Sequence, residues 1–110
     1  MRLKLTVTNL LLTALTITLA GVASADIAAE RQAELIYLLK HDCGSCHGMR
    51  LEGGLGPALK PKQFRQWDTE TLAATILYGR PGTPMPPWRP FITEQEAYWL
   101  AAQLKKGIQP

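Results

Sequence analysis

The stretch Cys43-Gly44-Ser45-Cys46-His47 decides how this 110-residue chain is interpreted. Its C-x-x-C-H pattern is typical of covalent attachment of a c-type haem. Two thiols three positions apart can each add across one haem vinyl group, and the imidazole that follows can then bind the iron. Gly44 and Ser45 are small, so the porphyrin edge can lie close to the backbone. The stretch predicts one haem c, with Cys43 and Cys46 as thioether residues and His47 as an axial iron ligand.

Three other interpretations of the two cysteines have less support. A thioredoxin-like redox pair needs a strand and a helix in a larger fold, and the chain has no alternating strand pattern. A zinc site needs four ligands, and only His41 is available outside the motif. A plain disulfide suits an oxidising compartment, but its very small loop would stabilise little, and His47 would have no role.

The second axial ligand has three candidates. Met49 follows His47 by two residues, and His41 precedes Cys43 by two, so neither side chain can easily reach the far face of the ring. Met85 lies 38 residues after His47, which is enough chain to pass around the haem edge. Five prolines in residues 81–90 hold its loop extended and stiff. Met85 is therefore predicted as the sixth ligand, and the alternative is a methionine that fills space in the core.

Three further residues are predicted to contact the haem or its ligand. A metal-bound imidazole usually donates its second N–H to a carbonyl or a carboxylate. The backbone carbonyl of Pro57, at the end of a glycine-rich loop after the motif, is the predicted acceptor for His47. Trp67 and Trp88 can donate from their indole N–H groups to haem propionates, or can pack in the core.

Residues 1–25 are predicted to be a secretory signal. Arg2 and Lys4 come first, no charged residue occurs from Leu5 to Val22, and Ala23-Ser24-Ala25 fits the small-x-small rule for signal peptidase. The alternative is an uncleaved membrane anchor, but threonines interrupt the apolar stretch. We expect cleavage after Ala25, and no stable membrane insertion thereafter.

Residues 26–110 are predicted to form one domain. This length excludes a catalytic barrel and a doubly wound nucleotide-binding fold. A formal net charge of +3 without a run of basic residues argues against a nucleic-acid partner. A chain this short builds a marginal core and usually needs a covalent or metal staple, and the haem would supply one.

The apolar spacing predicts an all-α fold with three main helices. The first extends from about Ile27 to His41. The second is capped by Asp68 and ended by Gly79. The third begins with a capping box, Thr93-Glu94-Gln95-Glu96, and ends near Gly107. The adjacent Tyr98 and Trp99 of the third helix are expected in the core.

Together these motifs resemble the class I cytochromes c over the whole of residues 26–110. The resemblance rests on the C-x-x-C-H after a first helix, Gly56-Pro57-Ala58-Leu59, the helix with Leu72, Ile76 and Gly79, and the Met85-Pro86 loop. Two longer stretches, 41–48 and 53–59, together with Gly79-Arg80-Pro81-x-x-Pro84-Met85-Pro86-Pro87-Trp88, are similar to the small NirC-type cytochromes encoded with cytochrome cd-type nitrite reductase. The resemblance implies three helices wrapped around one covalently bound haem.

The resemblance also implies a function, which is electron transfer rather than catalysis. The expected protein is a periplasmic monohaem carrier that donates electrons to cytochrome cd-type nitrite reductase in denitrification, as a monomer in transient complexes. One alternative is a redox partner or accessory factor in haem d1 maturation. Another is a haem-based sensor or enzyme in which Met85 leaves the iron.

The charge distribution leaves two interpretations open. Six basic and three acidic residues lie between Arg50 and Arg89. They form either a basic ring around an exposed haem edge, which would steer the carrier to an acidic partner, or an ordinary solvated surface.

Overall fold

The computed structural model describes residues 26–108, and the predicted signal, residues 1–25, lies outside them. The described residues contain helices and turns but no strand, in agreement with the all-α prediction. In chain order, the elements are α1 (Ala29–Leu38), the π-helical turn η1 (Leu39–Cys43), α2 (Gly44–His47), the 3₁₀ turn η2 (Pro61–Phe64), α3 (Thr69–Tyr78) and α4 (Glu94–Lys106).

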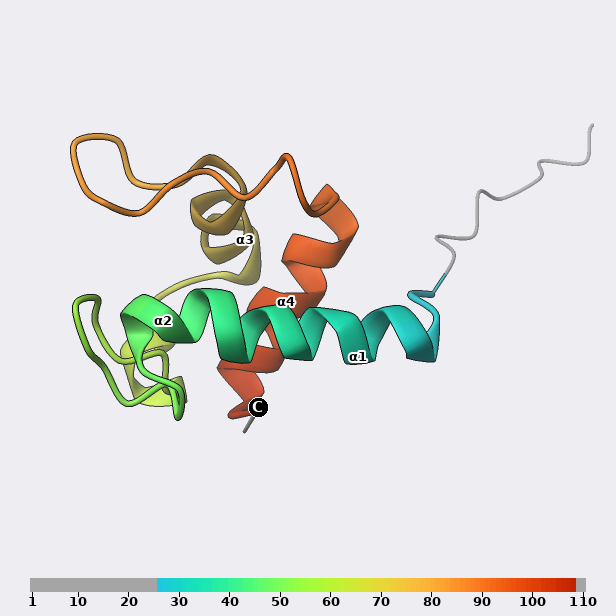
Figure 1. Cartoon of the computed structure of the whole chain (residues 1–110), viewed down its shortest axis with the longest axis horizontal. Helices are drawn as coiled ribbons and strands as arrows, with labels where there is room; N and C mark the ends of the chain where they lie inside the picture. Colours follow the sequence, from blue (N-terminus) through green and yellow to red (C-terminus); the bar gives the residue numbers. More distant parts are fainter. Residues whose placement is uncertain (1–25, 109–110) are drawn as a thin grey trace, which may run out of the picture.

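The first helix is longer than the sequence pattern indicates. α1, η1 and α2 follow one another without a break, as Figure 1 shows, so the helix continues six residues beyond His41 to His47. It ends at Gly48, whose φ of 88° few other residues adopt. The haem motif therefore lies on the last turn of a helix, and its two thiols are one helical turn apart.

The π-helical turn keeps one face of this long helix directed at the core. Leu35 and Leu39 have 0% and 1% of their surface exposed, and Cys43 packs against the same cluster. A step of four residues along an α-helix rotates by slightly more than one turn, because a turn takes 3.6 residues. The same step along a π-helix rotates by slightly less than one turn, because a π-helical turn takes more residues. The two deviations cancel, so Leu35, Leu39 and Cys43 stay on one side.

The other helices begin and end where the sequence predicts. The Asp68 carboxylate accepts a hydrogen bond from the backbone N–H of Thr71 at 2.6 Å, which caps α3. α3 ends at Gly79, with φ 68°. Thr93 and Glu96 form the expected capping box at the start of α4, and Gly107 ends α4 in the left-handed conformation.

The core is small and consists mainly of leucines and alanines. α3 packs on α4, and α4 crosses the first helix (Figure 1). Trp99 is half-buried against this core, but the expectation for Tyr98 is wrong, since 51% of its surface is exposed. The side chain of Tyr98 lines a shallow groove between α3 and α4 instead. Thirteen hydrophobic side chains are buried: Leu35, Leu39, Leu51, Phe64, Leu72, Ala73, Ile76, Leu77, Ile92, Ala97, Leu100, Ala101 and Leu104.

An ion pair ties the first helix to α4. The Arg31 Nε lies 2.5 Å from Glu96 Oε1, and a second guanidinium nitrogen donates to the carbonyl of Phe91 at 3.3 Å. The hydrogen bond from Arg31 holds the pKa of Glu96 below its usual range, although desolvation opposes this shift. Glu96 thus serves both as part of the α4 cap and as the partner of a residue 65 positions earlier.

We expect Glu96→Gln to lower the free energy of unfolding by about 1–2 kcal/mol at pH 7. Glutamine can still complete the capping box, so the decrease in the free energy of unfolding reports the loss of the ion pair alone. Because the folded-state pKa of Glu96 is depressed, its contribution is present above the unfolded value of about 4.3 and is lost as pH falls through the lower folded value. Urea unfolding of both proteins at pH 7 and pH 3 measures this. A difference that persists unchanged at pH 3 contradicts the assignment.

Candidate haem-binding site

His47 is oriented by a hydrogen bond to the loop that follows it. Its ring nitrogen Nδ1 lies 2.7 Å from the backbone carbonyl oxygen of Pro57, the contact that the sequence predicts. A carbonyl oxygen can only accept, so Nδ1 carries the hydrogen and Nε2 keeps its lone pair. This arrangement leaves Nε2 available to bind a metal, with the orienting contact that metal-ligating histidines usually make.

The loop from Gly48 to Leu59 folds back on the end of α2. The N–H of Gly53 donates to the His47 carbonyl at 2.8 Å, and the N–H of Gly56 donates to the Cys46 carbonyl at 2.7 Å. These bonds satisfy carbonyls that the helix end leaves without partners. A Cβ on Gly54 would lie 2.8 Å from the same Cys46 carbonyl, so glycine is needed for the close approach. The loop is therefore built against the motif.

Gly56 leaves room for the His47 ring. A Cβ at this position would lie 2.8 Å from Cε1 and 2.9 Å from Nδ1 of His47. The φ of Gly56 is not in the left-handed region, so the contact with the ring accounts for the need for glycine. A sequence pattern does not reveal this contact, because it depends on how the loop folds back.

We predict that Gly56→Ala displaces the imidazole and lengthens its bond to the Pro57 carbonyl. The expected result is a shifted haem spectrum and a reduction potential that differs from the parent's, because the carbonyl tunes the basicity of the ligand. Redox titration with visible spectroscopy measures both. Leu55→Ala is the matched control, since Leu55 belongs to the same loop and is 94% exposed. An unchanged spectrum and potential in Gly56→Ala would mean that the ring does not depend on this contact.

The two thiols are free and differ in their surroundings. Cys43 is half-buried and packs against the core, whereas Cys46 is exposed. Burial raises the pKa of the Cys43 thiol to about 11, and the nearby Asp42 carboxylate adds to the shift. Neither sulfur is committed to a disulfide, so both are available to form thioethers.

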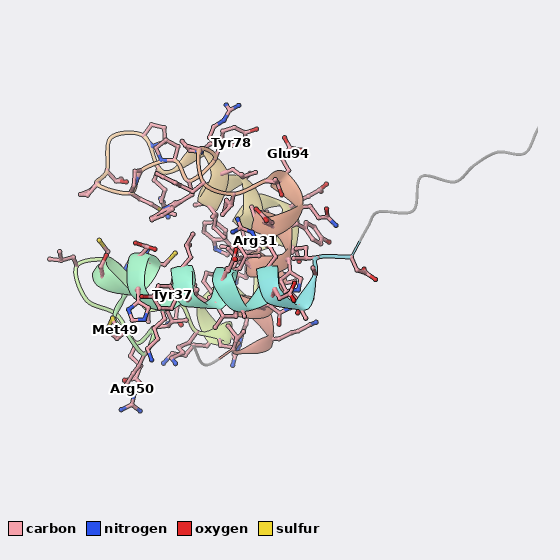
Figure 2. All side chains as sticks on the ribbon, turned by 45° about the vertical axis from the view of Figure 1, so that its right-hand side comes forward. Arg31, Tyr37, Met49, Arg50, Tyr78 and Glu94 are labelled. Carbon is pink, nitrogen blue, oxygen red and sulfur yellow. The ribbon has the colours of Figure 1, made fainter. Side chains whose placement is uncertain are left out.

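Met85 belongs to a loop that the end of α3 holds in place. The N–H of Arg80 donates to the Met85 carbonyl at 3.2 Å, and the N–H of Met85 donates to the Thr83 hydroxyl at 3.3 Å. A Cβ on Gly79 would lie 2.6 Å from the Met85 carbonyl. The side chain of Met85 is half-buried. Figures 1 and 2 both show this loop at the end of the molecule where α2 lies.

The other two ligand candidates have different surroundings. Met49 is 47% exposed, and its sulfur lies beside Gly44 of α2. His41 precedes the motif by two residues, and its ring lies against that of Tyr37, with the centroids 4.2 Å apart and the planes tilted by 39°. Figure 2 shows Tyr37 and Met49 near the motif end of the helix, away from the Met85 loop.

Trp67 and Trp88 are half-buried and pack against the core. The Trp88 ring lies 5.8 Å from that of Phe91, centroid to centroid. Their packing agrees with the core alternative stated for them, and contacts of the indole N–H groups with haem propionates stay a prediction.

One residue of the site region gave no sequence signal. Leu51 is fully buried and has a φ of 58°, the only positive value among the non-glycine residues that the structure describes. Its carbonyl accepts from Leu59 at 3.0 Å and its N–H donates to Gly48 at 2.8 Å. The burial of this side chain offsets the strain of the left-handed backbone and anchors the loop that carries Pro57.

Taken together, the described residues fit a haem group. They offer two unpaired thiols one turn apart, an imidazole with its Nδ1 already bonded, a glycine that makes room for that ring, and a methionine on a fixed loop. No cluster of three or more His, Cys, Asp or Glu side chains within residues 26–108 could hold a metal ion by itself.

Comparison with known proteins supports the same assignment. Residues 29–104 match the family model described as cytochrome C oxidase, cbb3-type, subunit III. The chain is 54% identical to cytochrome c55X of Pseudomonas aeruginosa over 89 residues, which cover 81% of this chain and 75% of that protein. It is also 54% identical to a solved structure of the c-type cytochrome NirC, with a TM-score of 0.74, over 76% of this chain and all of that one.

A second solved structure is similar over a smaller part of its length. This protein is the dihydro-heme d1 dehydrogenase NirN in complex with DHE, with 30% identity and a TM-score of 0.61. The match covers 66% of this chain but 16% of that one. The similarity is thus confined to a small part of the larger protein.

Proposed function

Because the chain belongs to the cytochrome c55X family of small c-type cytochromes, within the cbb3-type subunit III domain family, we propose that it is a periplasmic monohaem carrier that donates single electrons to cytochrome cd-type nitrite reductase. The observation that carries the haem assignment is the orientation of His47, with its Nδ1 bonded to Pro57 at the end of a C-x-x-C-H helix.

The residues of this chain would hold one haem c covalently. Cys43 and Cys46 would form the thioethers, and Nε2 of His47 and the sulfur of Met85 would bind the iron. When bound, the group supplies a reversible one-electron couple. The protein orients the imidazole through Pro57, fixes the methionine loop through Gly79 and Arg80, and excludes water with the leucine core. If His47 and Met85 both held the iron, they would leave no position for substrate, which favours a carrier over a catalyst.

The periplasmic location is part of the proposal. Its support is the basic start, the uncharged stretch and the Ala23-Ser24-Ala25 site of residues 1–25. The part of the chain that the structure describes has no helix long and apolar enough to cross a membrane. An intact mass equal to residues 26–110 plus one haem is expected for the protein isolated from the periplasm, and a mass that includes residues 1–25 would indicate a retained anchor.

Stopped-flow mixing tests the donor role. The reduced haem protein is mixed with oxidised cytochrome cd-type nitrite reductase at low and at high ionic strength. We expect fast oxidation that slows as salt is added, because a transient complex forms through opposite charges. Absence of transfer at both ionic strengths, with covalent haem confirmed, contradicts the donor role for this partner.

The match to dihydro-heme d1 dehydrogenase favours a second candidate function in haem d1 maturation. Removal of hydrogen from a dihydro-haem releases electrons that a carrier of this kind could accept one at a time. This function predicts normal nitrite reduction with other donors in vitro, and accumulation of an unfinished tetrapyrrole in a deletion strain. Extraction and chromatography of the tetrapyrroles of that strain separate the two candidates.

A further inference from the structure

Two stretches that lack acidic residues come together at one end of the molecule. Residues 53–67 and 97–108 contain no Asp or Glu. The C-terminal end of α4 packs on η2, since a Cβ on Gly107 would lie 3.1 Å from the Pro61 ring. Lys105 also donates a hydrogen bond to the Trp67 carbonyl. The basic residues that these contacts gather, here called the basic patch, are Lys60, Lys62, Arg65, Lys105 and Lys106.

The patch keeps most of its charge exposed. Lys62, Arg65 and Lys106 are exposed, and within residues 26–108 none of the three has a carboxylate at ion-pair distance. Two carboxylates belong to neighbouring segments. The hydrogen bond from the Thr71 backbone N–H lowers the Asp68 pKa, and the nearby Lys105 adds to this shift. Asp68 thus offsets part of the charge of Lys105, whereas Glu52 lies 3.6 Å from Arg50, outside the patch. The net positive charge of the patch therefore rests on Lys62, Arg65 and Lys106.

Four arginines do not join this patch. Arg31 is paired with Glu96 and Glu34, Arg50 with Glu52, and the Arg89 guanidinium lies over the Tyr78 ring at 5.5 Å. The Met85 loop, with Arg80, lies at the top of Figure 1, whereas the end of α4 lies at the bottom. The basic residues between Arg50 and Arg89, which the sequence analysis considered as one ring, are thus divided between two sides of the molecule.

α4 separates the charges along its length. Glu94 and Glu96 lie at its N-terminus, and Lys105 and Lys106 lie in its last turn. At 1.5 Å per residue its 13 residues span about 20 Å. The ion pair with Arg31 adds Glu34 to the acidic end. The net charge of the domain is small, but its acidic and basic residues lie at opposite ends of α4. The electric field of an acidic partner would therefore orient the domain before contact, with the basic end toward the partner.

The patch is close in the chain to the proposed iron ligand. Lys60 follows Pro57 by three residues, and the Pro57 carbonyl accepts the hydrogen bond from His47. Between them, Leu59 is bonded to the buried Leu51, which fixes the connecting segment. A protein bound on the patch would therefore be linked to His47 by a short, ordered path.

We propose that the basic patch is the docking surface for an acidic face of the redox partner protein, on the His47 side of the molecule rather than beside the Met85 loop. This inference rests on the proposed carrier function and specifies its partner surface. The exposed charges of Lys62, Arg65 and Lys106 attract the partner, and the Pro57–His47 contact connects that surface to the haem site.

Charge reversal tests the proposal in the haem-loaded protein. The patch variant carries Lys62→Glu, Arg65→Glu and Lys106→Glu. The matched control carries Lys40→Glu, Arg50→Glu and Arg89→Glu, which change the net charge equally. At low ionic strength we expect the second-order rate constant with cytochrome cd-type nitrite reductase to fall by about tenfold or more in the patch variant. The control should lose much less, and high salt should remove the difference.

A binding measurement gives an independent readout. Titration of the ¹⁵N-labelled protein with the reductase should broaden the amide signals of residues 60–66 and 104–107 before the others. Equal loss of rate in both variants, or an unchanged rate in the patch variant, overturns the proposal. Should the glutamates destabilise the fold, the corresponding glutamine variants test the same charges.

Two further outcomes are distinguishable. If the parent protein transfers no electrons to the reductase, the proposed partner is wrong. The rate of oxidation by ferricyanide, which is an anion, then tests the charge of the patch without a protein partner. Equal rates for the patch variant and the control variant would overturn the docking proposal. If instead the patch variant keeps its rate with the reductase but no longer binds vesicles with anionic phospholipid, the patch serves a membrane surface, and the docking proposal is overturned.

Discussion

Replacement of both Cys43 and Cys46 by alanine is expected to give a chain that retains no haem after denaturation and does not form a stable domain. Thirteen buried hydrophobic side chains, several of them alanines, form the whole core of the described residues. A chain of this size rarely gains more than about 3–5 kcal/mol from its core alone. Because the two thioethers would tether the haem to the end of the first long helix, their loss removes the group that would complete this core.

The measurement is haem-stained denaturing electrophoresis together with circular dichroism of the exported protein. Ser45→Ala is the matched control, since Ser45 lies between the cysteines, is exposed and bonds only to its neighbours Asp42 and Cys46. The control should keep covalent haem and helicity. A folded, haem-free double mutant would show that the leucine core is sufficient without the staple.

Replacement of Met85 by alanine is expected to lower the reduction potential and to open the iron to external ligands. Methionine opposite histidine raises the potential of a haem. Because axial ligands set haem potentials over a range of about 0.8 V, a fall on the order of 0.1 V or more is expected. Removal of the Met85 sulfur also leaves the iron with one ligand fewer, so the reduced variant should bind carbon monoxide at neutral pH.

Redox titration and carbon monoxide difference spectra of the variant measure both effects. Met49→Ala is the matched control, because Met49 is exposed and its sulfur lies next to Gly44. It should leave the potential and the spectrum unchanged. If Met85→Ala has no effect and His41→Ala does, the ligand assignment is wrong and His41 must leave Tyr37 to bind the iron.

Features that depend on local chemistry could be predicted from the sequence. The caps of α3 and α4 are signalled within four residues of each helix start, by Asp68 and by Thr93 with Glu96. The Pro57 carbonyl was predictable because the motif fixes where a histidine needs an acceptor, and the glycine-rich loop is short. The all-α class follows from the same helical spacing.

Features that depend on tertiary contacts could not be predicted. A leucine with positive φ, such as Leu51, has no sequence signature, since its burial alone offsets the strain. The first helix continues through a π-helical turn to His47, and this turn keeps Cys43 on the core side with Leu39. A search for the periodicity of an ordinary α-helix does not detect such a turn. Tyr98 is half-exposed because the face of α4 beside the α3 groove is not covered.

The placement of the basic residues also depends on the fold. Residues 60–65 and Lys106 are about forty positions apart in the chain, and the contact between Gly107 and Pro61 brings them together. The sequence suggested a ring that included Arg50 and Arg89, but both are engaged elsewhere, with Glu52 and with Tyr78. Counts of charge along the chain therefore left open whether a basic surface exists, and they did not indicate where it would lie.

The most direct test of the account is a spectroelectrochemical titration of the purified haem protein at pH 7, with spectra recorded under carbon monoxide. The account predicts a single reversible one-electron wave, with both axial positions filled in each redox state and no binding of carbon monoxide by the reduced form. More than one wave, or a reduced form that binds carbon monoxide readily, would contradict a carrier in which His47 and Met85 close the iron.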